Sequence, residues 1–124
     1  MSPTSYPRNK IKILLLENIS DAAVREFGLG GYTEVHRLGG AVSEAELIKA
    51  VKGVHVLGIR SKTQVTRGVI EAADKLLAIG AFCIGVNQVD LKAATEKGVA
   101  VFNAPHANTR SVAELIIGLC VMLI

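Results

Sequence analysis

The feature that most constrains the fold is a regular alternation between short apolar runs and segments bounded by helix-capping residues. The first run, Ile11 to Leu16, is apolar at nearly every position, which is typical of a strand buried on both faces of a sheet. Strands separated by helical crossovers run parallel, with right-handed connections. The sequence therefore predicts an α/β fold, a doubly wound parallel sheet of about five strands in the flavodoxin-like class. We expect the strands at residues 11–16, 34–38, 54–59, 76–82 and 99–102.

The segments between these runs carry residues that start and stop helices. Ser43-Glu-Ala-Glu46 is a capping box, and Asp90 and Gly98 stand where a helix cap and a terminal glycine belong. A second capping box, Ser111-Val-Ala-Glu114, opens a final apolar segment. We expect helices over residues 21–27, capped by Ser20 and ended by the glycines at 28–31; from the first capping box to Gly53; from Thr66 to about Asp74; and over residues 91–97.

Composition and charge exclude several classes of protein. The chain has 124 residues, of which 50% are apolar and 20% charged, so intrinsic disorder is excluded and one hydrophobic core is expected. The formal charge of +3 comes from scattered Lys and Arg without a basic stripe, so no nucleic-acid partner is predicted. The N-terminus lacks the apolar run of a signal peptide, which predicts a cytoplasmic protein with no membrane partner.

The two ends of the chain differ from the rest. Residues 1–10 are polar and interrupted by prolines, and we expect a disordered lead-in there. Residues 115–124 are apolar apart from Gly118, a run shorter than the roughly 20 residues that span a bilayer. A natural domain rarely ends within an uncapped apolar helix, so we interpret the chain as a fragment.

Three polar loops follow predicted strands, at the edge of a parallel sheet where ligands bind. Arg60-Ser-Lys-Thr63 offers a guanidinium, an ammonium and two hydroxyls, which suit a phosphate or carboxylate as well as an ordinary solvated loop. Cys83-Ile-Gly-Val-Asn87 has a glycine that would let backbone N–H groups approach a ligand, although a simple tight turn is the commoner use. Asn103-Ala-Pro-His-Ala-Asn-Thr-Arg110 leads into a helix N-terminus and offers either anion donors or routine caps.

Other sites receive less support. Cys83 and Cys120 have no CxxC and no histidine at metal-ligand spacing, so we interpret them as buried thiols and predict no metal site. His36 and His55 fall within predicted strands and are expected to be structural, whereas His106 lies on a loop where it could touch a ligand.

Common nucleotide and phosphate folds are also disfavoured. The chain contains no P-loop and no GxGxxG, because Gly28-Leu-Gly-Gly-Tyr-Thr33 lacks the last glycine and follows a helix. A receiver domain would place an Asp at the end of the third strand, where this chain has Arg60, although Glu17 follows the first strand. A flavodoxin would have a phosphate loop where this chain has Glu17-Asn-Ile-Ser20.

Three motifs in order resemble the D-isomer-specific 2-hydroxyacid dehydrogenase family, and the resemblance runs from about Lys10 to the last residue. They are Ile59-Arg-Ser-Lys-Thr63, Ile79-Gly-Ala-Phe-Cys-Ile-Gly-Val-Asn-Gln-Val-Asp-Leu91 and Val101-Phe-Asn-Ala-Pro-His-Ala-Asn-Thr-Arg-Ser-Val-Ala-Glu114. Many members have Gly-Val-Asp where this chain has Gly85-Val-Asn87. The branch that acts on 3-phosphoglycerate shares this amide and is the most similar.

The resemblance implies a substrate domain at residues 11–110 and NAD as cofactor. It also implies that residues 111–124 start a helix that crosses into an absent Rossmann domain, where the packing partners of this helix lie. It implies that Arg60 and Ser61 bind the phosphate or carboxylate of a small phosphorylated hydroxy acid. It also implies that Ile84 and Gly85 offer backbone N–H groups to the substrate carboxylate. The remaining implied contacts are a substrate hydrogen bond from Asn108 and nicotinamide contacts from Val112 and Ile84.

The same resemblance implies that the family's catalytic Arg, Glu and His lie beyond the end of this chain, so no catalytic residue is assigned. It also implies homo-oligomerisation through the cofactor domain. Two rival functions remain open. One is a dehydrogenase for glycerate, glyoxylate or lactate, and the other is a non-catalytic binding module of the same fold.

Overall fold

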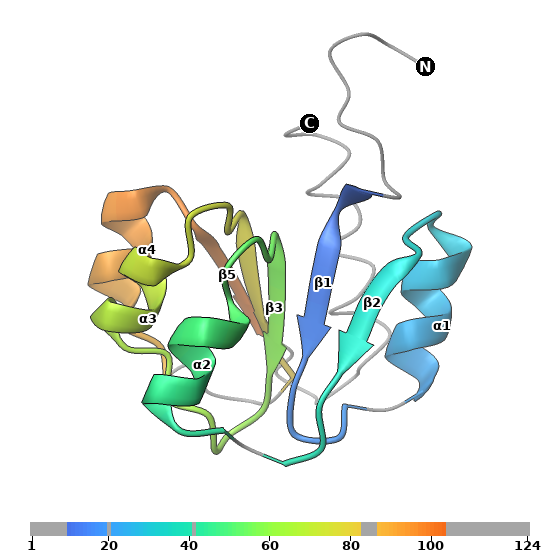
Figure 1. Ribbon diagram of the computed structural model, residues 1–124, viewed down its shortest axis with the longest axis horizontal. Helices are drawn as coiled ribbons and strands as arrows, with labels where there is room; N and C mark the ends of the chain where they lie inside the picture. The colour runs from blue at the N-terminus through green and yellow to red at the C-terminus, as the bar shows by residue number, and fades with distance from the viewer. Residues whose placement is uncertain (1–9, 20, 41, 83–86, 104–124) are drawn as a thin grey trace, which may run out of the picture.

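The computed structural model describes residues 10–19, 21–40, 42–82 and 87–103, and these form a parallel sheet with helices on both faces (Figure 1). All neighbouring strands pair in parallel, in the order β2-β1-β3-β4-β5. This order is the doubly wound, flavodoxin-like arrangement, so the predicted fold class is confirmed. The strands are β1 (Lys12–Leu15), β2 (Glu34–Arg37), β3 (Val56–Ile59), β4 (Ala78–Ala81) and β5 (Ala100–Asn103).

Each predicted strand is present, but the hydrogen-bonded ladders are shorter than the apolar runs or shifted by a residue. β1 has four residues within a predicted run of 11–16, and the flanking residues Ile11 and Leu16 are buried although they lie outside the paired strand. Val54 before β3 and Leu76 and Phe82 around β4 are likewise buried outside their strands. Burial therefore extends further along the chain than strand pairing does.

Three helix caps predicted from the sequence are confirmed. The side chains of Ser43, Thr66 and Asp90 accept hydrogen bonds from backbone N–H groups three residues on. Gly98 ends its helix with φ +74°, a conformation that glycine adopts without strain. The helices are α1 (Asp21–Leu29), α2 (Glu44–Ala50), α3 (Arg67–Ala72) and α4 (Leu91–Lys97).

Two helix ends differ from the sequence prediction. α1 continues for two residues past Phe27, and the chain turns at Gly31, where φ is +93°. α3 ends at Ala72, before the predicted end at about Asp74, because Ala73 leaves the helical conformation. Ser20, expected to cap α1, lies outside the described residues, as does the predicted capping box at 111–114.

The sheet carries a hydrophobic cluster on each face. Leu57, Ile59 and Ile79 face α2, α3 and α4, whereas Ile13, Leu15 and Val56 face α1. Figure 1 shows α1 on one face of the sheet and the other three labelled helices on the opposite face. All four residues of β3 are buried, as the apolar run predicts for a central strand.

The two described histidines that the sequence placed in strands have different surroundings. His55 is buried directly before β3, and its Nδ1 accepts a hydrogen bond of 3.0 Å from the backbone N–H of Lys12. This confirms a structural role for His55. His36 is exposed on the edge strand β2, and its Nε2 lies 3.2 Å from a carboxylate oxygen of Glu34.

The strand order creates a switch point between the carboxyl ends of β1 and β3. The chain leaves β1 toward β2 on one side of the sheet and returns to β3 on the other side. In open parallel sheets, such a reversal opens a crevice that binds ligands. The predicted domain boundaries at residues 10/11 and 110/111 are not tested, since residues 1–9 and 104–124 lie outside the described residues. Within the described ranges, no helix has the length and hydropathy needed to cross a membrane.

Candidate functional site

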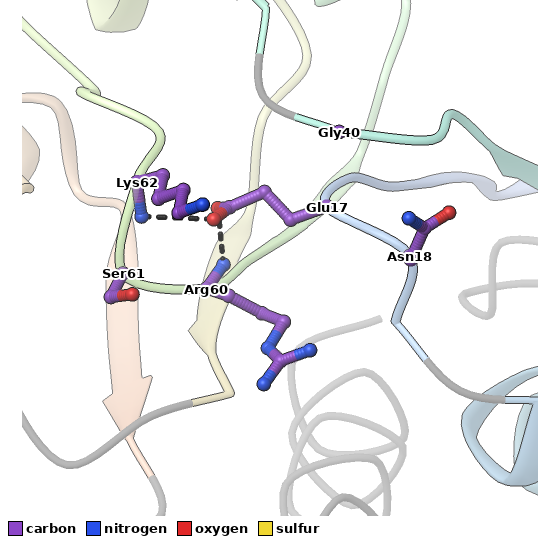
Figure 2. A pocket seen from close by; sticks show the side chains of 6 residues that line it. All are labelled: Glu17, Asn18, Gly40, Arg60, Ser61 and Lys62. Atoms are coloured by element: carbon purple, nitrogen blue, oxygen red, sulfur yellow. Dashed lines mark hydrogen bonds between the residues drawn. The ribbon is translucent and has the colours of Figure 1, made fainter.

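A pocket of about 290 Å³ lies at the switch point, where β1 and β3 end. Glu17 and Asn18 come from the loop after β1, and Gly40 comes from the loop after β2 (Figure 2). The loop after β3 completes the lining with Arg60, Ser61 and Lys62. Of the ionisable side chains in this lining two are cationic and one is anionic, so the pocket has a net positive charge suited to an anion.

The Glu17 side chain holds the loop after β3 through its backbone. One carboxylate oxygen accepts from the N–H groups of Arg60 at 2.7 Å and Thr63 at 3.2 Å, and the other accepts from Lys62 N–H at 2.8 Å. Figure 2 shows the carboxylate reaching across from the end of β1, while the Arg60 guanidinium points away from it. The carboxylate therefore fixes the loop backbone and leaves the Arg60 side chain directed elsewhere.

Glu17 is only 8% exposed, so its ionisation state depends on these donors. Burial acts to raise the pKa of its carboxyl group, but the neighbouring Thr63 side chain and the N–H groups of Arg60, Lys62 and Thr63 outweigh burial. The pKa is held below the ordinary value of 4.5. The Thr63 hydroxyl oxygen lies beside the carboxylate, but has no hydrogen bond of good geometry among the described residues. Glu17 is thus a carboxylate at neutral pH.

The backbone at this corner adopts an uncommon conformation. Glu17 and Asn18 have φ values of +58° and +55°, in the left-handed region that non-glycine residues seldom adopt. The Glu17 N–H donates to the carbonyl oxygen of Gly40 at 3.0 Å, which ties the loops after β1 and β2 together. Strained backbone of this kind persists only where surrounding contacts hold it.

The loop after β3 is also anchored from the segment before α4. The buried side chain of Gln88 donates from Nε2 to the carbonyl oxygen of Arg60 at 2.9 Å. The backbone of Val65 bonds to Gln88 and to Asp90, at 2.8 and 2.9 Å. Gln88 and Asp90 belong to the Asn-Gln-Val-Asp motif, so part of that motif has a structural role in holding the Arg60 loop and capping α4.

The described residues include two of the predicted site residues, and the structure brings both together. Arg60 and Ser61 are exposed side by side in the pocket lining. Within the described ranges, the Arg60 guanidinium has no ion-pair or hydrogen-bond partner. The other predicted contacts, Ile84, Gly85, Asn108 and Val112, lie outside the described residues, as do His106 and both cysteines.

Glu17 is the site residue that sequence reasoning missed. Its signal was an acidic residue directly after the first buried strand, which was weighed only as a feature of receiver domains. A metal site has no support in the part of the chain that the structure describes, where no three His, Cys, Asp or Glu side chains cluster.

Comparison with protein families gives a match over most of the chain. The model for "D-isomer specific 2-hydroxyacid dehydrogenase, catalytic domain" matches residues 13–116. The matched range contains every lining residue of the pocket.

Two curated relatives share the name D-3-phosphoglycerate dehydrogenase. The protein from Dictyostelium discoideum is 54% identical over 118 residues, covering 94% of this chain and 29% of the relative. The protein from Escherichia coli strain K12 is 47% identical over 124 residues, covering 100% of this chain and 30% of the relative. The chain thus spans less than a third of the length of either relative.

Solved structures share the fold. TT0316 protein from Thermus thermophilus has a TM-score of 0.69 and 31% identity, covering 88% of this chain and 35% of that protein. NAD⁺-bound 3-phosphoglycerate dehydrogenase from Entamoeba histolytica has a TM-score of 0.67 and 23% identity, covering 87% of this chain and 37% of that protein. At 23% identity, the likeness to the second structure supports the fold only.

Proposed function

This chain belongs to the D-isomer-specific 2-hydroxyacid dehydrogenase family, and from that premise we propose that it is the substrate-binding segment of an NAD-dependent D-3-phosphoglycerate dehydrogenase. The proposed reaction oxidises 3-phospho-D-glycerate to 3-phosphooxypyruvate, the first step of L-serine biosynthesis. The names of relatives at 54% and 47% identity support this substrate. As the family resemblance implies, the substrate-binding segment would comprise residues 11–110, and residues 111–124 would start a crossover helix into a cofactor domain.

The observation that carries the proposal is an uncompensated guanidinium in a cationic pocket at the switch point of the sheet. Arg60 faces the pocket without an ion-pair partner among the described residues, and Ser61 adds a hydroxyl beside it. A guanidinium presents paired N–H donors that match the oxygens of a phosphate or a carboxylate. The pocket is therefore chemically suited to one charged end of a phosphorylated hydroxy acid.

In the proposed reaction, Arg60 and Ser61 bind and orient the substrate rather than transfer protons. A substrate held by one charged end has its hydroxyl-bearing carbon restricted to a small region outside the pocket, which lowers the entropic cost of reaching the reactive geometry. The family's catalytic Arg, Glu and His would come from sequence beyond this chain. The backbone N–H groups of Ile84 and Gly85 and the side chain of Asn108 are further proposed contacts to substrate.

The described residues do not by themselves fit NAD. A dinucleotide is bound at a glycine-rich turn that opens a helix, and the sequence has no GxGxxG. The pocket of about 290 Å³ is of a size for a small anion. NAD, which would accept the hydride, is therefore proposed to be held mainly by a domain outside this chain, with Val112 and Ile84 near its nicotinamide ring.

The test is to replace Arg60 by Gln in the full-length protein and to measure kcat/KM with 3-phosphoglycerate and with unphosphorylated glycerate. Loss of a charge-assisted pair of about 2 kcal/mol should lower kcat/KM for 3-phosphoglycerate roughly 30-fold. The value for glycerate should change little if Arg60 binds the phosphate. Arg67→Gln is the matched control, because Arg67 lies outside this pocket and pairs with Glu96 at 2.7 Å.

Two outcomes would contradict the proposal. A wild-type protein that reduces no NAD with 3-phosphoglycerate but oxidises glycerate or lactate would assign the protein to another branch of the family. A wild-type protein without turnover on any 2-hydroxy acid would favour the non-catalytic binding module. Homo-oligomerisation and a cytoplasmic location stay predictions.

A further inference from the structure

We propose that Glu17 is a positioning residue for substrate binding, which acts by fixing the backbone from which Arg60 and Ser61 project. The inference rests on the function proposed above and adds to it a residue that makes no direct contact with substrate. Glu17 follows β1 and the Arg60 loop follows β3, so the interaction joins the two strands that flank the switch point.

The first argument is the geometry of the loop. The N–H groups of Arg60, Lys62 and Thr63 converge on the two oxygens of one carboxylate, at 2.7, 2.8 and 3.2 Å. Three backbone bonds within four residues leave the loop little freedom to rotate. The anchored backbone therefore fixes the position from which the Arg60 side chain starts, and the guanidinium, which has no partner among the described residues, stays available to a ligand.

The second argument concerns which groups remain available to a ligand. Successive backbone N–H groups that converge form a concavity able to bind an anion. In this protein, Glu17 occupies that concavity from inside the fold. An incoming phosphate or carboxylate is therefore left with the side chains of Arg60, Ser61 and Lys62, which line the pocket, and with the N–H group of Ser61, which Glu17 does not occupy.

The third argument is the backbone that presents the carboxylate. Glu17 and its neighbour Asn18 both have positive φ values, +58° and +55°. Two consecutive residues in this region cost conformational energy, which the surrounding structure must offset. The Glu17 N–H bond to Gly40 and the three bonds to its carboxylate provide that support at the rim of the proposed site.

The kinetic test uses Glu17→Gln in the full-length protein, with KM measured for 3-phosphoglycerate and for NAD. The amide keeps one acceptor oxygen but turns an NH₂ group toward a backbone donor, so part of the loop loses its anchor. We expect KM for 3-phosphoglycerate to rise roughly 10-fold, with kcat and KM for NAD near their wild-type values. A purely structural role would instead remove active molecules, which lowers apparent kcat and leaves KM unchanged.

Asp74→Asn is the matched control. The Asp74 carboxylate also accepts a backbone hydrogen bond, from Gly53 N–H at 3.1 Å. Gly53 and Asp74 precede β3 and β4, so this bond lies at the amino-terminal ends of the strands, opposite to the proposed site. This variant should leave KM for 3-phosphoglycerate unchanged. A wild-type KM in Glu17→Gln, or an equal rise in both variants, overturns the inference.

Hydrogen exchange of the wild-type protein provides a test that needs neither turnover nor a folded variant. The amides of Arg60, Lys62 and Thr63 should exchange slowly, although Arg60 and Lys62 are exposed residues. The Ser61 amide, which has no partner among the described residues, should exchange fast and serves as the internal reference. Fast exchange at Arg60 and Lys62 would overturn the inference even if Glu17→Gln failed to fold. An inactive wild-type protein with this protection pattern would refute the proposed function and retain Glu17 as the anchor of the loop.

Discussion

At the scale of single residues, His55 makes stability depend on pH. Burial lowers the pKa of its imidazole below the ordinary 6.5, Lys75 lowers it further, and Asp74 opposes them. Between the folded and unfolded pKa values the unfolded chain binds more protons, so the stabilisation present above 6.5 is lost as pH falls through that window. Protonation of Nδ1 would also remove the acceptor for Lys12 N–H. We expect the urea concentration at the unfolding midpoint to decrease when the pH is lowered from about 7.5 to about 5.5.

His55→Asn is the control for this prediction. An Asn side chain offers an oxygen acceptor to Lys12 N–H but does not titrate. Its urea midpoint should change less with pH than the wild-type midpoint over the same range. Glu17 does not confuse the comparison, because its pKa is held below 4.5 and its stabilising contribution is lost only at more acidic pH. Equal pH dependence in both proteins would contradict the assignment to His55.

Glu17 also shows where residue-level prediction from sequence stops. The place of Arg60 and Ser61 at the end of a buried strand could be predicted from a local pattern, whereas their role toward substrate is implied by the family resemblance and stays a prediction. The partner of that loop lies 43 residues away in sequence, and only the strand order brings the two together. A lone Glu after a strand has many possible roles, so its chemistry depends on a tertiary contact that the sequence does not display.

At the scale of elements, a side chain of α4 donates hydrogen bonds to the backbone carbonyl groups at the carboxyl end of α3. Lys97 Nζ donates to the carbonyl oxygens of Ile70, Glu71 and Ala73 at 2.7, 3.1 and 3.0 Å. A cation at a helix C-terminus interacts favourably with the helix dipole and with carbonyl groups that lack helical partners. Lys97→Met should lower the free energy of unfolding by about 1 kcal/mol, measured by urea denaturation.

Lys92→Met tests whether this loss is specific to the capping interaction. Lys92 is exposed on the same helix and has no hydrogen bond or ion pair within the described ranges. The same substitution there should change stability by less than about 0.5 kcal/mol. Similar losses in the two variants would mean that the Lys97 contacts contribute little.

The elements themselves could be predicted well, and their ends less well. Caps at Ser43, Thr66 and Asp90 were readable because a cap depends on contacts within one helical turn. The early end of α3 was not readable, since the apolar pattern continues past Ala72 into the buried Ala73 and Leu76. Lys97 was likewise unpredictable as a cap, because the helix that it caps is a different one.

At the scale of the whole molecule, the order of the strands turns separate loops into a site. β1 and β3 are neighbours although β2 lies between them in sequence, and this arrangement sets Glu17 beside the Arg60 loop. The fold class was predictable from the alternation of strands and helices. The flavodoxin-like class also implies that β1 and β3 are neighbours, but it does not specify which side chain of one loop bonds to which group of the other.

The last prediction concerns the 124-residue chain on its own, which we expect to reduce no NAD in the presence of 3-phosphoglycerate. The described residues form a single sheet with a small pocket lined by two cationic side chains and one anionic side chain, and the sequence has no GxGxxG to hold a dinucleotide. Hydride transfer requires the substrate carbon and the nicotinamide ring to be held in contact, so a site for substrate alone gives no turnover. NADH formation should be followed by fluorescence with the purified chain, beside the full-length Escherichia coli relative as positive control. Turnover that scales with the amount of chain and survives a further purification step would refute this prediction, and would require a cofactor site within these residues.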